Sequence, residues 1–312
     1  MAFYSPPFIE PEVRSQIDRL VQERNAVILS HYYCRPEIHE VAHFVGDSLG
    51  LSQEAARNPA KVIVFCGVHF MAETASILCP DKTVLLANID AGCPMADMVA
   101  SEDLAQRKKE IPGVPVLTYV NSPAAVKALS DICCTSANVV AVLRSLASKQ
   151  VLMTPDKNLA IYAQKLVPEK EVLLWPGFCP THHRLNLKEV EQLKRDNPDA
   201  VVVAHPECQP KILKLADVIS STSGLIKHCS ESPKKKFIIL TEQGVLHPLK
   251  KKNPNKTFLT PASEMICPNM KKVSLQNIID ALQTMTPVIE VAEEIRIPAL
   301  KAVERMMAVP RD

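Results

Sequence analysis

The sequence predicts an α/β protein made of three similar three-layer αβα units, each with a parallel sheet. Three observations predict this fold class. Cys-Pro dipeptides recur at nearly equal intervals, prolines that begin predicted helices recur with the same period, and apolar β-branched runs alternate with amphipathic segments. Self-similarity at a fixed period indicates a repeat architecture, and the alternation is typical of layered strands and helices.

The period is about 87 residues. The Cys-Pro cysteines are Cys93, Cys179 and Cys267, separated by 86 and 88 residues. The matching prolines are Pro36, Pro123 and Pro210, separated by 87 and 87 residues. Each proline falls where the first turn of a helix is expected, because its missing N–H costs nothing there. In the second unit, Ser122 is the expected N-cap.

Each unit is predicted to run β-α-β-α-β-α-β after a leading amphipathic helix. The first strands are AVILSH (26–31), VPVLTY (114–119) and AVVVAH (200–205), and later strands are KVIVFCG (61–67), QVLMTPD (150–156) and KFIILTE (236–242). Runs without alternation suit strands that are buried on both faces of a parallel sheet. The last strands, TVLLAN (83–88), EVLLWP (171–176) and KTFLTP (256–261), each lead into a Cys-Pro. The expected domains are 1–98, 99–184 and 185–272, followed by a helical tail, 273–312, that packs on them.

Composition excludes several classes of protein. A net charge of +2 gives no reason to expect nucleic acid or a membrane surface as partner, and the lysine runs at 234–236 and 250–252 lack the interleaved aromatics that base stacking requires. No run of 18 apolar residues predicts a transmembrane helix, and the proline-broken, acidic start is unlike a secretory signal. Ten cysteines without an export signal favour reduced thiols and a cytoplasmic location.

Three cysteines at equivalent positions predict a shared metal centre. If the units surround a pseudo-threefold axis with the carboxyl ends of their strands inward, Cys93, Cys179 and Cys267 converge. Three thiolates suit either zinc with an open position or an iron–sulfur cluster, and long-range spacing does not separate the two. The other seven cysteines are expected not to follow the period and to serve in packing; they are Cys34, Cys66, Cys79, Cys133, Cys134, Cys208 and Cys229.

Two further sets of polar residues occupy equivalent loops. After the first strands stand His31, Tyr33, Tyr119, Asn121, His205 and Glu207, residue types that acid–base chemistry requires. After the second helices stand Ser48, Ser136 and Thr222, whose hydroxyls at helix N-termini would form an anion site. Glu73 and Glu242 match each other in the first and third units, and we expect structural roles for both.

The motifs together resemble the quinolinate synthase family. They are SHYYCRPEI and GDSL, GVHFMAETASIL, AGCPMADM, TYVNS, GFCPTH, HPEC, STSG, TEQG and CPNMK, in this order over residues 25–272. The resemblance implies three α/β domains around a pseudo-threefold axis, with the active site in the central cavity. It also implies one [4Fe–4S] cluster per chain, held by Cys93, Cys179 and Cys267, with one open iron acting as a Lewis acid.

The resemblance further implies a reaction and residue roles. Iminoaspartate would condense with dihydroxyacetone phosphate, losing phosphate and two waters to give quinolinate for NAD biosynthesis. Glu207 and Tyr33 would be the acid–base pair, with Tyr119 assisting. The substrates would be oriented or held by His31, Asn121, His205, Ser48, Ser136 and Thr222. Iminoaspartate would come from an aspartate-oxidising enzyme, through a possible transient contact.

Two features of this sequence differ from the pattern of the family, and three alternative functions stay open. Cys267 stands alone where some relatives carry CxxCxxC, and Cys34 replaces a polar residue and could compete for metal during assembly. The rivals are a zinc or iron–sulfur hydro-lyase, an electron carrier and a metal-free sugar-phosphate-binding protein. An electron carrier would normally use a fourth thiolate, and no fourth recurring cysteine is expected.

Overall fold

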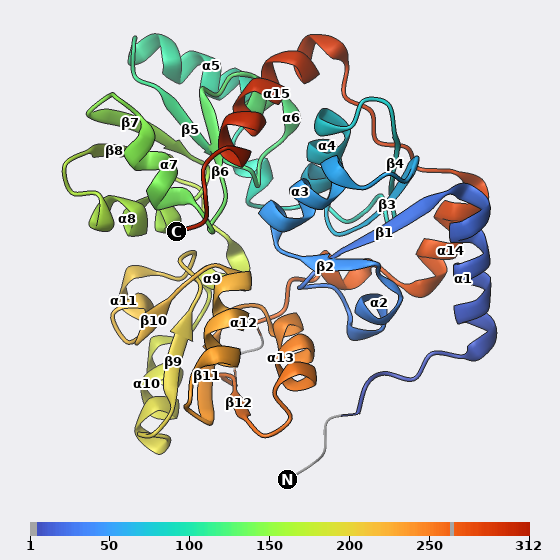
Figure 1. Ribbon diagram of the computed structural model, residues 1–312. Helices are drawn as coiled ribbons and strands as arrows, with labels where there is room; N and C mark the ends of the chain where they lie inside the picture. Colours follow the sequence, from blue (N-terminus) through green and yellow to red (C-terminus); the bar gives the residue numbers. More distant parts are fainter. Residues whose placement is uncertain (1–4, 263–264) are drawn as a thin grey trace.

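A computed structural model describes residues 5–262 and 265–312 and contains three parallel four-stranded sheets, each flanked by helices (Figure 1). Ser263 and Glu264, which begin the third Cys-Pro segment, lie outside the described residues. The predicted fold class is confirmed. The boundaries between the domains stay predictions, although each sheet falls within one predicted unit.

The three sheets have the same topology. In each unit the second strand is at one edge beside the first strand, and the third and fourth strands follow on the other side of the first. The first sheet contains β1 (Ala26–His31), β2 (Phe44–Gly46), β3 (Val62–Cys66) and β4 (Thr83–Leu86), in the order β2-β1-β3-β4. The second contains β5 (Val116–Tyr119), β6 (Ile132–Cys134), β7 (Gln150–Thr154) and β8 (Glu171–Leu174), in the order β6-β5-β7-β8. The third contains β9 (Val201–Ala204), β10 (Val218–Ile219), β11 (Lys236–Leu240) and β12 (Thr257–Leu259), in the order β10-β9-β11-β12.

The helices follow the same repeat. The first unit has α1 (Pro11–Arg24), α2 (Pro36–Val41), α3 (Ser48–Arg57), α4 (His69–Leu78) and the 3₁₀ turn η1 (Ala96–Met98). The second has α5 (Ser101–Glu110), α6 (Ala124–Ala128), α7 (Val139–Ser145), α8 (Lys157–Leu166) and α9 (Pro180–His183). The third has α10 (Leu187–Asp196), α11 (Pro210–Leu213), α12 (Thr222–Glu231), η2 (Gln243–Val245), α13 (Leu246–Lys252) and η3 (Met270–Lys272). Within the described ranges, every helix is too short or too polar to span a bilayer.

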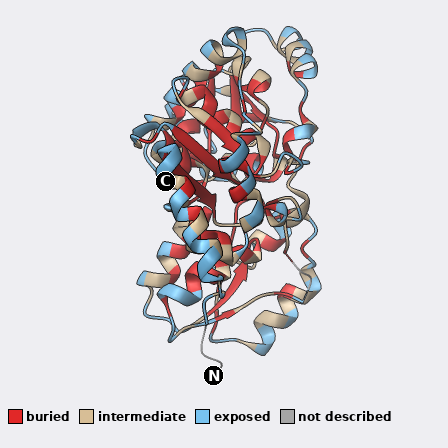
Figure 2. Ribbon diagram, turned by 90° about the vertical axis from the view of Figure 1, so that its right-hand side faces the viewer, coloured by how far each residue is buried: buried red, intermediate tan, exposed pale blue. Residues whose placement is uncertain are grey.

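The central strands form the interior of each unit. All six residues of β1 and all five of β3 are buried, as their unbroken apolar sequences predict. Figure 2 shows the strands buried and the exposed residues mainly on the outer helices. The loops at the carboxyl ends of these buried strands carry the polar motifs.

The second unit departs from the predicted capping. Pro36 and Pro210 occupy the first helical turn as expected, but α6 begins one residue after Pro123, which is itself the N-cap. The prediction that Ser122 caps this helix is wrong: its buried hydroxyl has no hydrogen-bond partner. The Ser122 N–H instead bonds to the carbonyl oxygen of Val120, which directs the side chain into the interior.

The expectation that no other cysteine follows the period is also wrong. Cys34 and Cys208 are 174 residues apart, which is two periods, and occupy equivalent turns after β1 and β9. The Cys34 thiol donates to the carbonyl oxygen of Cys66, and the Cys208 thiol donates to that of Leu240. Both side chains are fully buried. Their hydrogen bonds connect the turn after the first strand of each unit to its third strand.

The tail forms two helices, α14 (Leu275–Thr284) and α15 (Glu293–Met307). Helix α14 contacts α1 and β3, whereas α15 lies between the first two units and contacts α4, α6 and β6 (Figure 1). Between them, the carbonyl oxygen of Pro287 and the N–H of Ile289 bond to β4, which covers that edge of the first sheet.

Candidate active site

A cavity lies where the carboxyl ends of the three sheets meet. The cavity has a volume of about 70 Å³. All twelve predicted site residues line it: His31, Tyr33, Ser48, Cys93, Tyr119, Asn121, Ser136, Cys179, His205, Glu207, Thr222 and Cys267. The structure brings every predicted residue to one place; their chemical roles stay predictions.

Each unit contributes one cysteine, on the loop that follows its last strand. The three thiols are free and half-buried. Burial raises the pKa of Cys93 to about 12 and raises that of Cys179 well above its usual value. Cys93 interacts electrostatically with both of the others. A bound cation would stabilise the thiolates that burial disfavours, so this donor set fits a metal cofactor.

Two histidines have the same geometry in the first and third units. The Nδ1 of His31 accepts the N–H of Tyr33 at 3.2 Å, and the Nδ1 of His205 accepts the N–H of Glu207 at 3.3 Å. This contact leaves the proton on Nε2 in each neutral ring. Desolvation by burial lowers the pKa of His31 to about 4 and that of His205 to about 3, so both rings are neutral near pH 7. The Nε2–H of His205 donates to the Ser136 hydroxyl at 3.2 Å.

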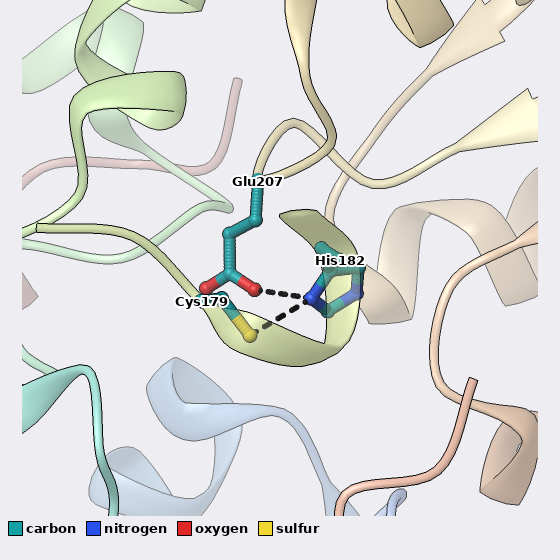
Figure 3. A group of neighbouring side chains, drawn as sticks. All are labelled: Cys179, His182 and Glu207. Atoms are coloured by element: carbon teal, nitrogen blue, oxygen red, sulfur yellow. Dashed lines mark hydrogen bonds and ion pairs between the residues drawn. The ribbon is translucent and has the colours of Figure 1, made fainter. Parts of the chain in front are cut away.

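A chain of hydrogen bonds in the cavity wall joins side chains from all three units. His182 Nδ1 lies 2.7 Å from Glu207 Oε2 and 3.2 Å from the Cys179 sulfur (Figure 3). On the other side of the ring, Nε2 lies 2.9 Å from the Thr241 hydroxyl, which lies 2.9 Å from the Tyr33 hydroxyl. The chain Glu207–His182–Thr241–Tyr33 can therefore transmit a proton shift between a carboxylate and a phenol.

The acid–base groups of the cavity have strongly perturbed pKa values. Burial opposes the charge on Glu207, but His182 and His205 outweigh it and lower its pKa, so the group is a carboxylate. Burial and the Glu207 charge raise the pKa of Tyr33 and of Tyr119 well above 10. The site thus combines one ionised carboxylate with neutral phenols that can donate protons.

The predicted anion residues occupy two helix starts and one turn. Ser48 and Thr222 are the first residues of α3 and α12, but Ser136 precedes α7, whose N-cap is Asn138. The Thr222 hydroxyl lies 2.9 Å from the Tyr33 hydroxyl. The buried side-chain oxygen of Asn121 has no hydrogen-bond partner, although this residue lines the cavity. A buried acceptor without a partner indicates a place for a ligand donor.

Sequence reasoning missed His182, Thr241 and Asp47. His182 follows Cys179 by three residues, one helical turn along, and this spacing could have indicated it. Thr241 directly follows β11, a strand-end position like that of the residues identified after the first strands. Asp47 lines the cavity and caps α3 by accepting the Gly50 N–H at 2.9 Å.

A second donor set overlaps the three cysteines. One ligand atom each from Cys179, His182 and Glu207 lies within 4.8 Å of the others, close enough to hold a metal ion. Such an ion would leave Cys93 and Cys267 without a role. It would also take the Nδ1 that His182 directs toward Glu207.

The fold and the site define a three-unit α/β protein with thiols, imidazoles, phenols and a carboxylate around one buried cavity. A family model described as Quinolinate synthetase A protein matches residues 15–308. The proteins named quinolinate synthase from Geobacter sp. (strain M21) and Geotalea uraniireducens (strain Rf4) are 56% and 54% identical to this chain, over 300 and 303 residues. These alignments cover 96% and 97% of the chain, and 98% and 99% of the relatives. A quinolinate synthase from Methanosarcina barkeri is 51% identical over 300 residues, which is 96% of this chain and 98% of that protein. The chain therefore belongs to the quinolinate synthase family and is an enzyme.

Proposed function

We propose that this enzyme condenses iminoaspartate with dihydroxyacetone phosphate to quinolinate, releasing phosphate and two waters, in NAD biosynthesis. The observation that carries the proposal is the convergence of one thiol from each unit with the Glu207–His182–Thr241–Tyr33 chain in a single cavity. Forming a ring from two small molecules requires several proton transfers and eliminations, which such a set of groups can assist. The family name supports quinolinate as the product.

The proposed cofactor is one [4Fe–4S] cluster held by Cys93, Cys179 and Cys267. Three thiolates leave one iron of such a cluster without a protein ligand, and that iron supplies Lewis-acid chemistry when the cluster is bound. We favour this centre over a single ion at Cys179, His182 and Glu207 because it uses all three recurring cysteines. It also leaves His182 in the hydrogen-bond chain.

The side chains of the cavity would transfer protons, orient the substrates and bind their anionic groups. Glu207 would accept a proton at Oε2, while His182 Nδ1–H holds that oxygen and the Tyr33 hydroxyl supplies protons from the other end of the chain. Tyr119 would assist as a second neutral phenol. His31, His205 and Asn121 would orient carboxylate, carbonyl or hydroxyl groups. Phosphate or carboxylate groups would bind to the hydroxyls of Ser48, Ser136 and Thr222.

A cytoplasmic location also belongs to this proposal. All ten cysteines are free thiols, which is the state that a reducing compartment maintains. Iminoaspartate would be supplied by an aspartate-oxidising enzyme, with a transient contact as one route of delivery. No nucleic acid or membrane enters the proposed function.

An anaerobic assay tests the reaction. Iron-loaded protein is mixed with iminoaspartate and dihydroxyacetone phosphate, and quinolinate is measured by chromatography. We expect product that depends on both substrates, and none when dihydroxyacetone replaces its phosphate ester. An iron-loaded enzyme that forms no quinolinate would refute the proposal.

A further inference from the structure

Two buried carboxylates outside the proton chain each hold the backbone of one metal-site cysteine. Asp156 Oδ2 accepts the N–H of Cys179 at 3.1 Å, and Glu242 Oε1 accepts the N–H of Cys267 at 3.1 Å. Both carboxylates are 0% exposed. A buried carboxyl oxygen that loses its hydrogen bonds is costly, so these contacts hold the two loops in place.

The two carboxylates occupy equivalent places in the second and third units. Asp156 lies two residues after β7, and Glu242 lies two residues after β11. In each case the other carboxylate oxygen binds the start of the following helical segment. Asp156 Oδ1 accepts the N–H groups of Asn158 and Leu159, at 2.7 and 3.0 Å. Glu242 Oε2 accepts the N–H of Gly244 at 2.7 Å.

Each carboxylate therefore joins two loops of its own unit, the loop after the third strand and the cysteine loop. Glu242 Oε1 also lies 2.8 Å from the Lys271 ammonium, which partly balances its charge. The lysine comes from the same Cys267 segment. Both ends of that segment are thereby attached to one buried side chain.

The first unit lacks this arrangement. Two residues after β3, the equivalent position is Val68, a buried apolar residue. The expected match between Glu73 and Glu242 is therefore wrong, because Glu73 lies inside α4. Among residues 5–262 and 265–312, no carboxylate accepts the N–H of Cys93. In all three units a backbone hydrogen bond joins these two loops; its donors are His69, Lys157 and Gln243. The units therefore differ in the carboxylate that holds the cysteine N–H, which the first unit lacks.

We propose that Asp156 and Glu242 are positioning residues that hold the Cys179 and Cys267 loops in ligating geometry before the metal centre binds. The Cys93 loop takes its final geometry from the metal. This inference rests on the proposed three-cysteine centre. Groups that hold metal ligands in this way fix their orientation, and changing them weakens metal binding by about 10- to 100-fold.

Matched substitutions test the role of the carboxylates. Asp156→Asn and Glu242→Gln keep the size of each side chain but remove one of its acceptors. The control is Asp97→Asn, which changes an exposed carboxylate four residues after Cys93. Anaerobic iron loss to a chelator is followed by absorbance, the reduced centre by electron paramagnetic resonance, and the fold by circular dichroism. We expect iron loss about tenfold faster in both variants than in the control, and an altered resonance spectrum.

Rates of iron loss within about twofold of the control, in variants that fold, would overturn the proposal.

If a substitution prevents folding, the wild-type protein can be measured instead. After iron is removed from the wild-type protein, amide hydrogen exchange is compared at Cys93, Cys179 and Cys267. We expect slow exchange at Cys179 and Cys267 and fast exchange at Cys93. Equal exchange at all three would overturn the proposal. If anaerobic wild-type protein holds no metal, the proposed cofactor fails, and the exchange data still decide whether the loops are held.

Discussion

At the scale of single residues, the chemistry of the cavity depends on one carboxylate among neutral neighbours. Glu207 is ionised, whereas His31, His205, Tyr33 and Tyr119 are neutral near pH 7. A base and proton donors can therefore coexist within one buried site. The carboxylate is the only member of this group that carries a charge, so it is the most sensitive position for substitution.

Glu207→Gln should keep the metal centre and lose turnover. The amide cannot accept a proton, so we expect the rate of quinolinate formation to fall at least about 100-fold, the usual contribution of a positioned base. Iron content should equal that of the wild type. The matched control is Glu171→Gln, an exposed residue of β8 that should leave the rate unchanged. Near-normal turnover in the Glu207 variant would remove this residue from the mechanism.

Ser122→Ala should not destabilise the protein. The Ser122 hydroxyl is buried without a partner, so its removal ends a desolvation cost and should raise the free energy of unfolding by 0 to about 1 kcal/mol. Ser130→Ala is the contrast, because its hydroxyl bonds to Thr118 and to the carbonyl oxygen of Val126. That variant should lose about 1 kcal/mol. Chemical denaturation measures both, and a less stable Ser122→Ala variant would contradict the structure.

At the scale of elements, the loops of the site are held by residues far away in sequence. Arg311, which follows α15, binds both oxygens of Asp47, at 2.7 and 2.9 Å. Asp47 caps α3, whose first residue is Ser48. The tail thus stabilises the start of a helix that lines the cavity.

Arg311→Ala should lower stability in a pH-dependent way. Burial alone would raise the pKa of Asp47, but its hydrogen bonds from Arg311 outweigh burial and lower that pKa below 3.8. The pair therefore contributes stability above pH 3.8 that is lost as the pH falls through the folded-state pKa. We expect a loss of about 1–3 kcal/mol at pH 7 that disappears in acid. Arg107→Ala, which breaks an exposed pair with Glu110, should leave stability nearly unchanged at every pH, because water and salt screen such pairs. A pH-independent difference for Arg311→Ala would contradict this account.

Much of the fold was predictable because the units repeat. The unbroken apolar runs of β1, β5 and β9 indicate buried parallel strands, and their equivalent positions indicate shared loops. The start of α6 was not predictable, because the sequence does not show that the Ser122 N–H bonds to the Val120 carbonyl oxygen and leaves Pro123 as the N-cap. The positions of His182 and Thr241 could have been indicated by spacing and by a strand end, but the hydrogen bonds between units that give them their roles cannot be read from the sequence.

At the scale of the whole molecule, the metal site exists only where the three units meet. No unit offers more than one of the three cysteines that line the cavity. Loss of one thiol should therefore disrupt metal binding at the whole centre, rather than alter one domain alone.

Cys179→Ala should abolish iron binding and activity together, although Cys93 and Cys267 are unchanged. The control is Cys229→Ala, which alters a buried cysteine of α12 that does not line the cavity. Iron analysis after anaerobic purification distinguishes the two variants. Full iron content in Cys179→Ala would mean that the ligand assignment is wrong.

The most direct measurement is the iron and sulfide content of the wild-type chain, purified without oxygen. One cluster held by three thiolates predicts four irons and four sulfides per chain, with the absorbance of a [4Fe–4S] centre. A colourless protein that contains zinc and no sulfide would contradict the central claim.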